Sequence, residues 1–227
     1  QLTPKNRAGI DVLYPDDSLS LRNAAARTDA YWPYVSKKQE PPKELTYGEF
    51  PVDFFASLTV RAAAIKGIAD RTQVEFVDLG SGAGRLVLAA AAMEGGWKRC
   101  RGVELLPSLH VLAEEKLGEA KQMEGFLRSP VSFECCGWDS PELDLASVGV
   151  AFAYYHGGIH GSVSATRTED GVLGELTAAL SAKLSPGTIV VTTDSKLGEG
   201  FEAVEQIEGR NAEEAGGLTT GYIWRKL

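Results

Sequence analysis

The chain has 227 residues, of which 44% are hydrophobic and 24% are charged, a composition typical of a globular protein that buries its own core. Its 23 Lys and Arg against 31 Asp and Glu give a formal net charge of −8, which argues against a broad surface for nucleic acid or an anionic membrane. The longest apolar run, 86–93, is far shorter than the roughly 20 residues of a membrane span, so no membrane partner is expected.

Residues 1–45 are expected to form a partly helical N-terminal extension of a larger domain, residues 46–227. The extension holds five prolines and scattered charges. Only 18–31 has the composition of a helix, with Ser18 or Ser20 as its N-cap. We expect this extension to pack on the domain that follows it.

The domain from Tyr47 onward has a regular pattern. Pro51 opens an expected helix whose apolar residues share one face as far as Ala69. Beyond it, short apolar runs that predict buried strands alternate with runs at helical spacing. The expected strands are 74–80, 100–104, 131–135, 148–154 and 188–193, and the expected helices among them are 85–94, 107–120 and 172–184.

Such alternation predicts a parallel sheet covered by helices, because a right-handed crossover places a helix between successive parallel strands. The last strand-like runs, 201–208 and 219–225, have no helix between them and are expected to pair antiparallel at the sheet edge. The sequence therefore predicts an α/β fold: a seven-stranded, mostly parallel, Rossmann-like sheet with helices on both faces and an antiparallel edge hairpin.

A glycine-rich turn, DLGSGAGR, follows the first expected strand. Gly80, Gly82 and Gly84 remove side chains, so the backbone can turn sharply and a ligand can approach the next helix. A dinucleotide-binding fingerprint would have a third glycine at position 85, where Arg85 stands. Asp78 favours a cationic ligand, because its carboxylate can attract an amine. The alternative is that Asp78 only accepts hydrogen bonds from the loop amides.

Acids also end the next two expected strands. Glu104 is placed to accept both hydroxyls of a ribose. Asp139 follows the third strand, where it can accept a hydrogen bond from an adenine amine while Trp138 covers the ring. Because the carboxyl ends of parallel strands meet at one edge of a sheet, these acids and Asp78 are expected to surround one ligand.

This pattern resembles the class I S-adenosylmethionine-dependent methyltransferases, whose first motif is similar to FVDLGSGAG. The segments LTYGE, VDLGSGAGRLVLAAA and GVELLPSLHVLAEE further resemble the non-SET histone lysine methyltransferases of the disruptor of telomeric silencing type. The resemblance extends over residues 45–194. It implies S-adenosylmethionine as cofactor and a protein lysine as methyl acceptor.

The resemblance also implies roles for individual residues. Tyr47, Glu49 and Phe50 would close over the methionine end of the cofactor. Asp78, Gly80 and Arg85 would contact the same end, Glu104 the ribose and Asp139 the adenine.

The fourth strand departs from this family. Its members have an Asn pair at the strand end, where this chain has Phe152 to Tyr155 (FAYY). Tyr154 and Tyr155 are our candidate catalytic residues, because an aromatic channel would lower the pKa of an incoming lysine amine by desolvation and tolerate the methylated cation. Two alternatives remain: a small-molecule methyltransferase of the same fold, and a non-catalytic S-adenosylmethionine-binding protein.

Other signals point away from competing functions. His156 and His160 lie in a Gly-rich run that fixes no ligand geometry, so no metal is expected. The [N/D]-P-P-[Y/F] element of base-modifying methyltransferases is absent where AYYHGG stands. The run 199–214 carries six acids against Arg210, which does not favour a nucleosome as partner.

The three Cys, which lack CxxC spacing, indicate a reducing, intracellular location. This location is expected to be the nucleus, the cytoplasm, or an organelle if a targeting segment has been removed.

Overall fold

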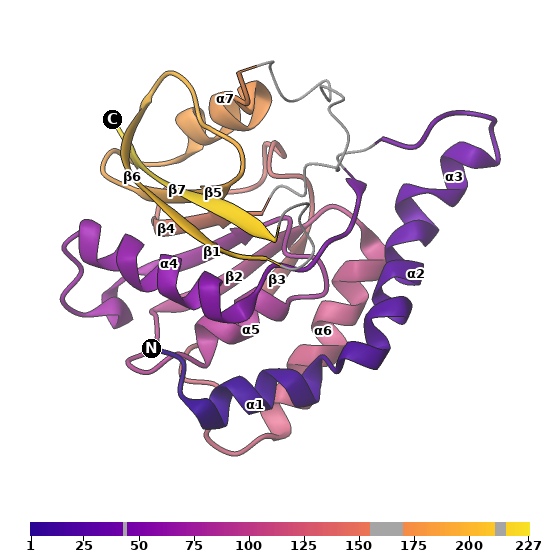
Figure 1. The fold of residues 1–227 in the computed structure, drawn as a ribbon, viewed down its shortest axis with the longest axis horizontal. Helices are drawn as coiled ribbons and strands as arrows, with labels where there is room; N and C mark the ends of the chain where they lie inside the picture. The colour runs from indigo at the N-terminus through magenta and orange to yellow at the C-terminus, as the bar shows by residue number, and fades with distance from the viewer. Residues whose placement is uncertain (43–44, 155–169, 212–216) are drawn as a thin grey trace.

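The computed structural model of the chain describes residues 1–42, 45–154, 170–211 and 217–227. Within these ranges seven strands form one sheet, in the order β3-β2-β1-β4-β5-β7-β6 (Figure 1). The strands are β1 Glu75–Leu79, β2 Arg99–Glu104, β3 Val131–Cys135, β4 Val148–Ala153, β5 Ile189–Thr193, β6 Phe201–Arg210 and β7 Leu218–Lys226. The first five pair in parallel, and β7 runs antiparallel to both β5 and β6. The predicted sheet with its antiparallel edge hairpin is confirmed.

Helices cover both faces of the sheet, as predicted, but unequally. The helices of the domain are α4 Val52–Ile65, α5 Arg85–Ala91, α6 Pro107–Gln122 and α7 Gly174–Lys183, with a 3₁₀ turn at Arg71–Gln73. Side chains of α4, α5 and α6 share one core with Phe76 of β1, whereas Leu180 of α7 packs with Val77 on the opposite face. The alternation of Phe76 and Val77 follows from the two-residue period of a strand. Helix α4 ends earlier than predicted, because Gly67 has a positive φ of 74°.

The N-terminal extension is more helical than the sequence suggested. It contains α1 Pro4–Leu13, a 3₁₀ turn Asp16–Ser18, α2 Leu19–Ala30 and the short α3 Trp32–Val35. The prediction that only 18–31 is helical was therefore wrong for α1. That helix begins at a regular cap: the Thr3 hydroxyl accepts from the Asn6 amide at 3.1 Å, and Pro4 takes the first helical position. Figure 1 shows α2 running alongside α6.

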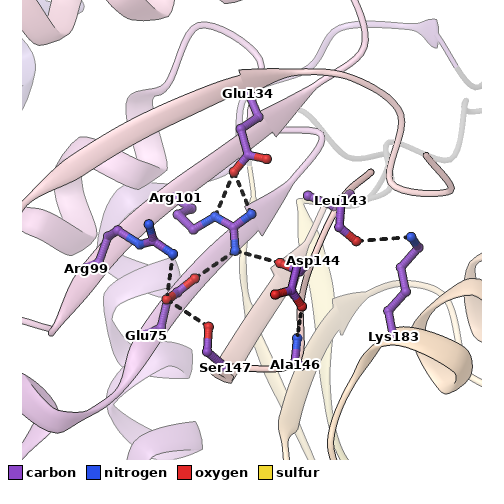
Figure 2. Close-up of polar contacts among 9 residues, drawn as sticks. All are labelled: Glu75, Arg99, Arg101, Glu134, Leu143, Asp144, Ala146, Ser147 and Lys183. Atoms are coloured by element: carbon purple, nitrogen blue, oxygen red, sulfur yellow. Dashed lines mark hydrogen bonds and ion pairs between the residues drawn. The ribbon is translucent and has the colours of Figure 1, made fainter. Parts of the chain in front are cut away.

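A partly buried ion network joins β1, β2 and β3 (Figure 2). Arg101 of β2 donates to Glu75 of β1 at 2.8 Å and to Glu134 of β3 at 2.5 Å. Arg99 reaches the same Glu75 carboxylate at 2.9 Å, and the Asp144 carbonyl accepts from Arg101 at 2.8 Å. Glu75 is the first residue of β1, whereas Glu134 is the fourth of the five residues of β3, so the network ties the start of β1 to the later part of β3. We assign it to holding the strands in register.

Candidate functional site

A cavity of about 390 Å³ opens at the carboxyl ends of the parallel strands. This volume is within the range typical of small-molecule sites. Most of the predicted site residues line it, namely Tyr47, Glu49, Phe50, Asp78, Gly80, Gly82, Arg85, Glu104, Trp138, Asp139 and Tyr154. Gly84 does not line it, and Tyr155 lies outside the described residues.

The glycine-rich turn connects β1 to α5 through left-handed backbone. Gly80, Gly82 and Gly84 have φ values of 77°, 54° and 83°, where a side chain would be strained. A Cβ on Gly82 would lie 2.7 Å from the Tyr47 ring, so this glycine lets Tyr47 cross the turn. A Cβ on Gly84 would lie 2.6 Å from Phe133. The missing side chain of Gly84 therefore makes room for core packing, and a contact of its backbone with the ligand stays a prediction.

Two carboxylates, Asp78 and Glu104, lie almost buried at the ends of β1 and β2. Burial, and then the neighbouring Glu104 carboxylate, raise the pKa of Asp78 to about 8. Glu104 accepts one hydrogen bond on each oxygen, from the Gly82 amide and the Leu106 amide, both at 2.7 Å. Each carboxylate oxygen has two lone pairs, so both keep a position for a further donor. Burial raises the pKa of Glu104, although these amides oppose the shift.

The segment before α4 forms one wall of the cavity. Glu49 is its centre: one carboxylate oxygen lies 3.0 Å from Arg85, and the other accepts from the Tyr47 hydroxyl at 2.8 Å. Arg22, on α2, donates to that second oxygen as well. Burial, and then Glu49, raise the pKa of Tyr47 well above its usual value, so its hydroxyl stays protonated as a donor. Arg22 was not among the residues predicted from the sequence, because an Arg in an alanine-rich helix is typical of an exposed position.

The opposite wall combines the loop that follows β3 with the start of α7. Trp138 and Asp139 line the cavity together with Leu173, Glu175 and Leu176. Sequence reasoning missed the last three, which carry no recognisable motif.

An aromatic cluster lies between the first wall and the end of β4. The ring of Phe50 is 5.1 Å from that of Tyr154, 5.5 Å from that of Phe152 and 5.5 Å from that of Phe54. These separations are typical of packed aromatic pairs. Tyr154 is half-buried and lines the cavity, whereas Phe152 is fully buried beneath it. The cavity therefore has a polar region at Asp78 and Glu104 and an aromatic region at Phe50 and Tyr154.

Many solved structures resemble this fold, and three of them are described here. An RNA methyltransferase from Salinibacter ruber in complex with S-adenosyl-L-homocysteine has 24% identity and a TM-score of 0.55, over 79% of this chain and 94% of that one. An rRNA methyltransferase from Streptomyces viridochromogenes has 13% identity and a TM-score of 0.56, over 79% and 86%. A magnesium protoporphyrin IX methyltransferase from Synechocystis, with bound S-adenosylmethionine, has 12% identity and a TM-score of 0.52, over 93% and 98%.

The chain thus has the fold of the class I S-adenosylmethionine-dependent methyltransferases. Within that class, residues 35–131 match the family model described as histone methylation protein DOT1. The predicted resemblance to enzymes of this type is confirmed, although the match starts before residue 45 and ends at the third strand. No curated protein sequence matches the chain significantly.

Two further observations concern metals and membranes. In the described ranges, no three His, Cys, Asp or Glu side chains gather as ligands for a metal ion. His156 and His160 lie outside those ranges. Of the helices that the structure describes, none has the length and apolar character needed to cross a bilayer.

Proposed function

We propose that this protein binds S-adenosylmethionine in the cavity and transfers its methyl group to the side-chain amine of a protein lysine. The observation that carries the proposal is the buried pair Asp78 and Glu104, which flanks the glycine-rich turn at the ends of β1 and β2. A pair of carboxylates kept from water needs a cation or a set of donors, and S-adenosylmethionine has an ammonium, a sulfonium and two ribose hydroxyls.

The residues of the cavity fit this molecule. Asp78 can accept from the ammonium, and Glu104 can accept from the ribose with its remaining lone pairs. The Ser81 hydroxyl oxygen is buried beside them and has no hydrogen-bond partner among the residues that the structure describes, as expected of a group that serves a ligand. Trp138 and Leu176, on the opposite wall, offer apolar surface for an adenine ring. When bound, S-adenosylmethionine supplies an electrophilic methyl group.

The aromatic region is suited to the acceptor. A lysine amine must be neutral to act as a nucleophile, and the Phe50 and Tyr154 rings would desolvate it and so lower its pKa. Tyr154 would also exclude water and orient the amine toward the methyl group. The lysine ammonium would lose its proton to solvent before the attack. Its lone pair would then form the nitrogen–carbon bond as the methyl–sulfur bond of the cofactor breaks, so that S-adenosylhomocysteine leaves. The methylated product is a cation that aromatic faces can hold.

Protein lysine is favoured over other acceptors by the family match. The family model that matches residues 35–131 is that of a histone methylation protein. The matched residues include the first wall of the cavity, the glycine-rich turn and Glu104. The structural neighbours, by contrast, are two RNA methyltransferases and a magnesium protoporphyrin IX methyltransferase. A small-molecule acceptor is therefore the second candidate.

Transfer of a labelled methyl group tests the proposal. Purified protein is incubated with labelled S-adenosylmethionine and cell extract, and protein, RNA and small-molecule fractions are counted separately. We expect label in protein, recovered as methyl-lysine after hydrolysis, and none with Asp78→Ala. Label in RNA or small molecules would reassign the acceptor. Cofactor binding without any transfer would mean a non-catalytic binding protein.

A further inference from the structure

The N-terminal helices contact the loops that build the cavity. The Tyr14 hydroxyl, just after α1, donates to the Ala83 carbonyl of the glycine-rich turn at 2.8 Å. The Asp29 carboxylate, on α2, accepts from the Ser108 amide in the first turn of α6 at 2.7 Å. That turn follows Glu104 closely in the chain. The extension thus touches two loops of the site through buried or half-buried polar contacts.

A third contact reaches the first wall through Arg22. Only 4% of Arg22 is exposed, and its guanidinium donates to Glu49 and to the Ser18 hydroxyl while it lies 5.7 Å from the Tyr14 ring centroid. Arg85 contacts the other oxygen of Glu49. The Glu49 carboxylate is therefore held from two sides, by one arginine of the extension and one of the domain.

This arrangement transmits the position of α2 to the cavity wall. Glu49 also accepts from the Tyr47 hydroxyl, and the Tyr47 ring crosses Gly82 so closely that no side chain fits there. Glu49 has 9% of its side chain exposed, so the loss of one cationic partner would leave a nearly buried carboxylate only partly compensated. Such a carboxylate would turn toward water, and the Tyr47 side chain, which is hydrogen-bonded to it, would shift as well.

We propose that Arg22 is a positioning residue of the methyltransferase site: through Glu49 it holds Tyr47 across the glycine-rich turn and so shapes the wall of the cavity. The N-terminal extension then contributes to the shape of the binding site. The inference rests on the proposed function only for the identity of the ligand, S-adenosylmethionine.

Cofactor affinity and local exchange together test this role. We expect Arg22→Ala to weaken binding of S-adenosylhomocysteine by about tenfold or more, measured by calorimetry, because a buried charged hydrogen bond is lost. Arg22→Lys should recover part of the affinity, since an ammonium can meet Glu49 but cannot also reach Ser18 with a planar fork. Arg7→Ala is the matched control: Arg7 belongs to the same extension, pairs with Asp11 and Asp53, and does not line the cavity.

A double-mutant cycle separates positioning from general stability. If Arg22 acts through Glu49, the combined Arg22→Ala and Glu49→Gln variant should bind little worse than the weaker single variant. In ligand-free protein, Arg22→Ala should speed hydrogen exchange at residues 45–50 while α5 keeps its protection. If Arg22→Ala fails to fold, Arg22→Lys is used in the cycle and the exchange measurement instead.

The outcomes are distinguishable. Unchanged affinity in Arg22→Ala, an equal loss in Arg7→Ala, or additive losses in the cycle would each overturn the role of Arg22. Failure of the wild-type protein to bind S-adenosylhomocysteine would overturn the proposed function instead. In that case, the exchange measurement at 45–50 still decides whether Arg22 positions this wall.

Discussion

Asp78 and Glu104 interact across the ends of β1 and β2, with only 2% and 6% of their surfaces exposed. Two carboxylates this close and this buried do not both ionise easily, and burial together with Glu104 raises the pKa of Asp78 to about 8. At neutral pH the ligand-free protein therefore holds a proton on Asp78. A cationic ligand would favour the ionised form and displace that proton.

Cofactor binding should consequently depend on pH. Below the pKa of Asp78, binding of a ligand with an ammonium must release a proton, so affinity should rise as the pH increases from about 6 to about 8 and then level off. Calorimetry in buffers of different ionisation enthalpy measures the release directly. Asp78→Asn should bind more weakly and show no such proton release. A pH-independent affinity in the wild-type protein would contradict this prediction.

Replacement of Glu104 by Gln should weaken cofactor binding while the fold is kept. The NH2 group of Gln would face the backbone N–H of either Gly82 or Leu106, and two donors cannot bond to each other. The substitution also removes the negative charge that Glu104 offers to the ribose. We expect a loss of about 1–3 kcal/mol in binding free energy. Glu119→Gln, on the exposed side of α6, is the control. Equal affinities of wild-type protein and Glu104→Gln would remove Glu104 from the ligand site.

The glycines of the turn should differ in their effect on stability. The Cβ of Gly80→Ala would meet no atom of the described ranges within 4 Å, so this change should cost only the strain of a positive φ, about 1 kcal/mol. Gly84→Ala adds a collision with Phe133 and should cost about 1–3 kcal/mol more. Chemical denaturation of both variants compares the free energies of unfolding. If Gly84→Ala were the more stable variant, the assignment of Gly84 to core packing would fail.

Tyr154→Ala should lower turnover more than it weakens cofactor binding. Its ring packs against that of Phe50 in the aromatic region of the cavity. We expect kcat for lysine methylation to fall by roughly tenfold or more, with the Kd for S-adenosylhomocysteine within about threefold of wild type. Tyr31→Ala, at an exposed tyrosine, serves as control. Wild-type turnover in Tyr154→Ala would exclude Tyr154 from the acceptor channel.

A free protein lysine should be a better acceptor than an intact nucleosome. Nucleosome binding requires cationic surface to neutralise phosphates, and this chain carries a net charge of −8 with six acids in 199–214. Methylation of free histones and of nucleosomes is compared at about 50 and 200 mM salt. We expect the free histones to be preferred at both. Efficient nucleosome methylation that falls steeply with increasing salt would contradict this prediction, because it would show that the protein binds nucleosomal phosphates despite its negative net charge.

The sequence by itself determined the architecture and the ligand end of the sheet. Alternating strand and helix periods require a parallel sheet, and the carboxyl ends of parallel strands share one edge, so Asp78, Glu104 and Asp139 had to meet there. All three line the cavity. Local patterns suffice for this, because the alternation of strands and helices and the acids that follow the strands can be read from short stretches of chain.

Only the tertiary structure decided which side chains position the walls of the cavity at the carboxyl ends of the strands. Arg22 meets Glu49 across 27 residues of sequence, and no local pattern distinguishes a buried arginine in an alanine-rich helix from an exposed one. Gly84 belongs to the glycine-rich motif, yet its missing side chain makes room for Phe133, which comes from another strand. The hydrogen bond from the Gly82 amide to the Glu104 carboxylate likewise depends on how the glycine-rich turn is placed against the end of β2. Such contacts arise from packing between distant segments, which periodicity and motif spacing do not encode.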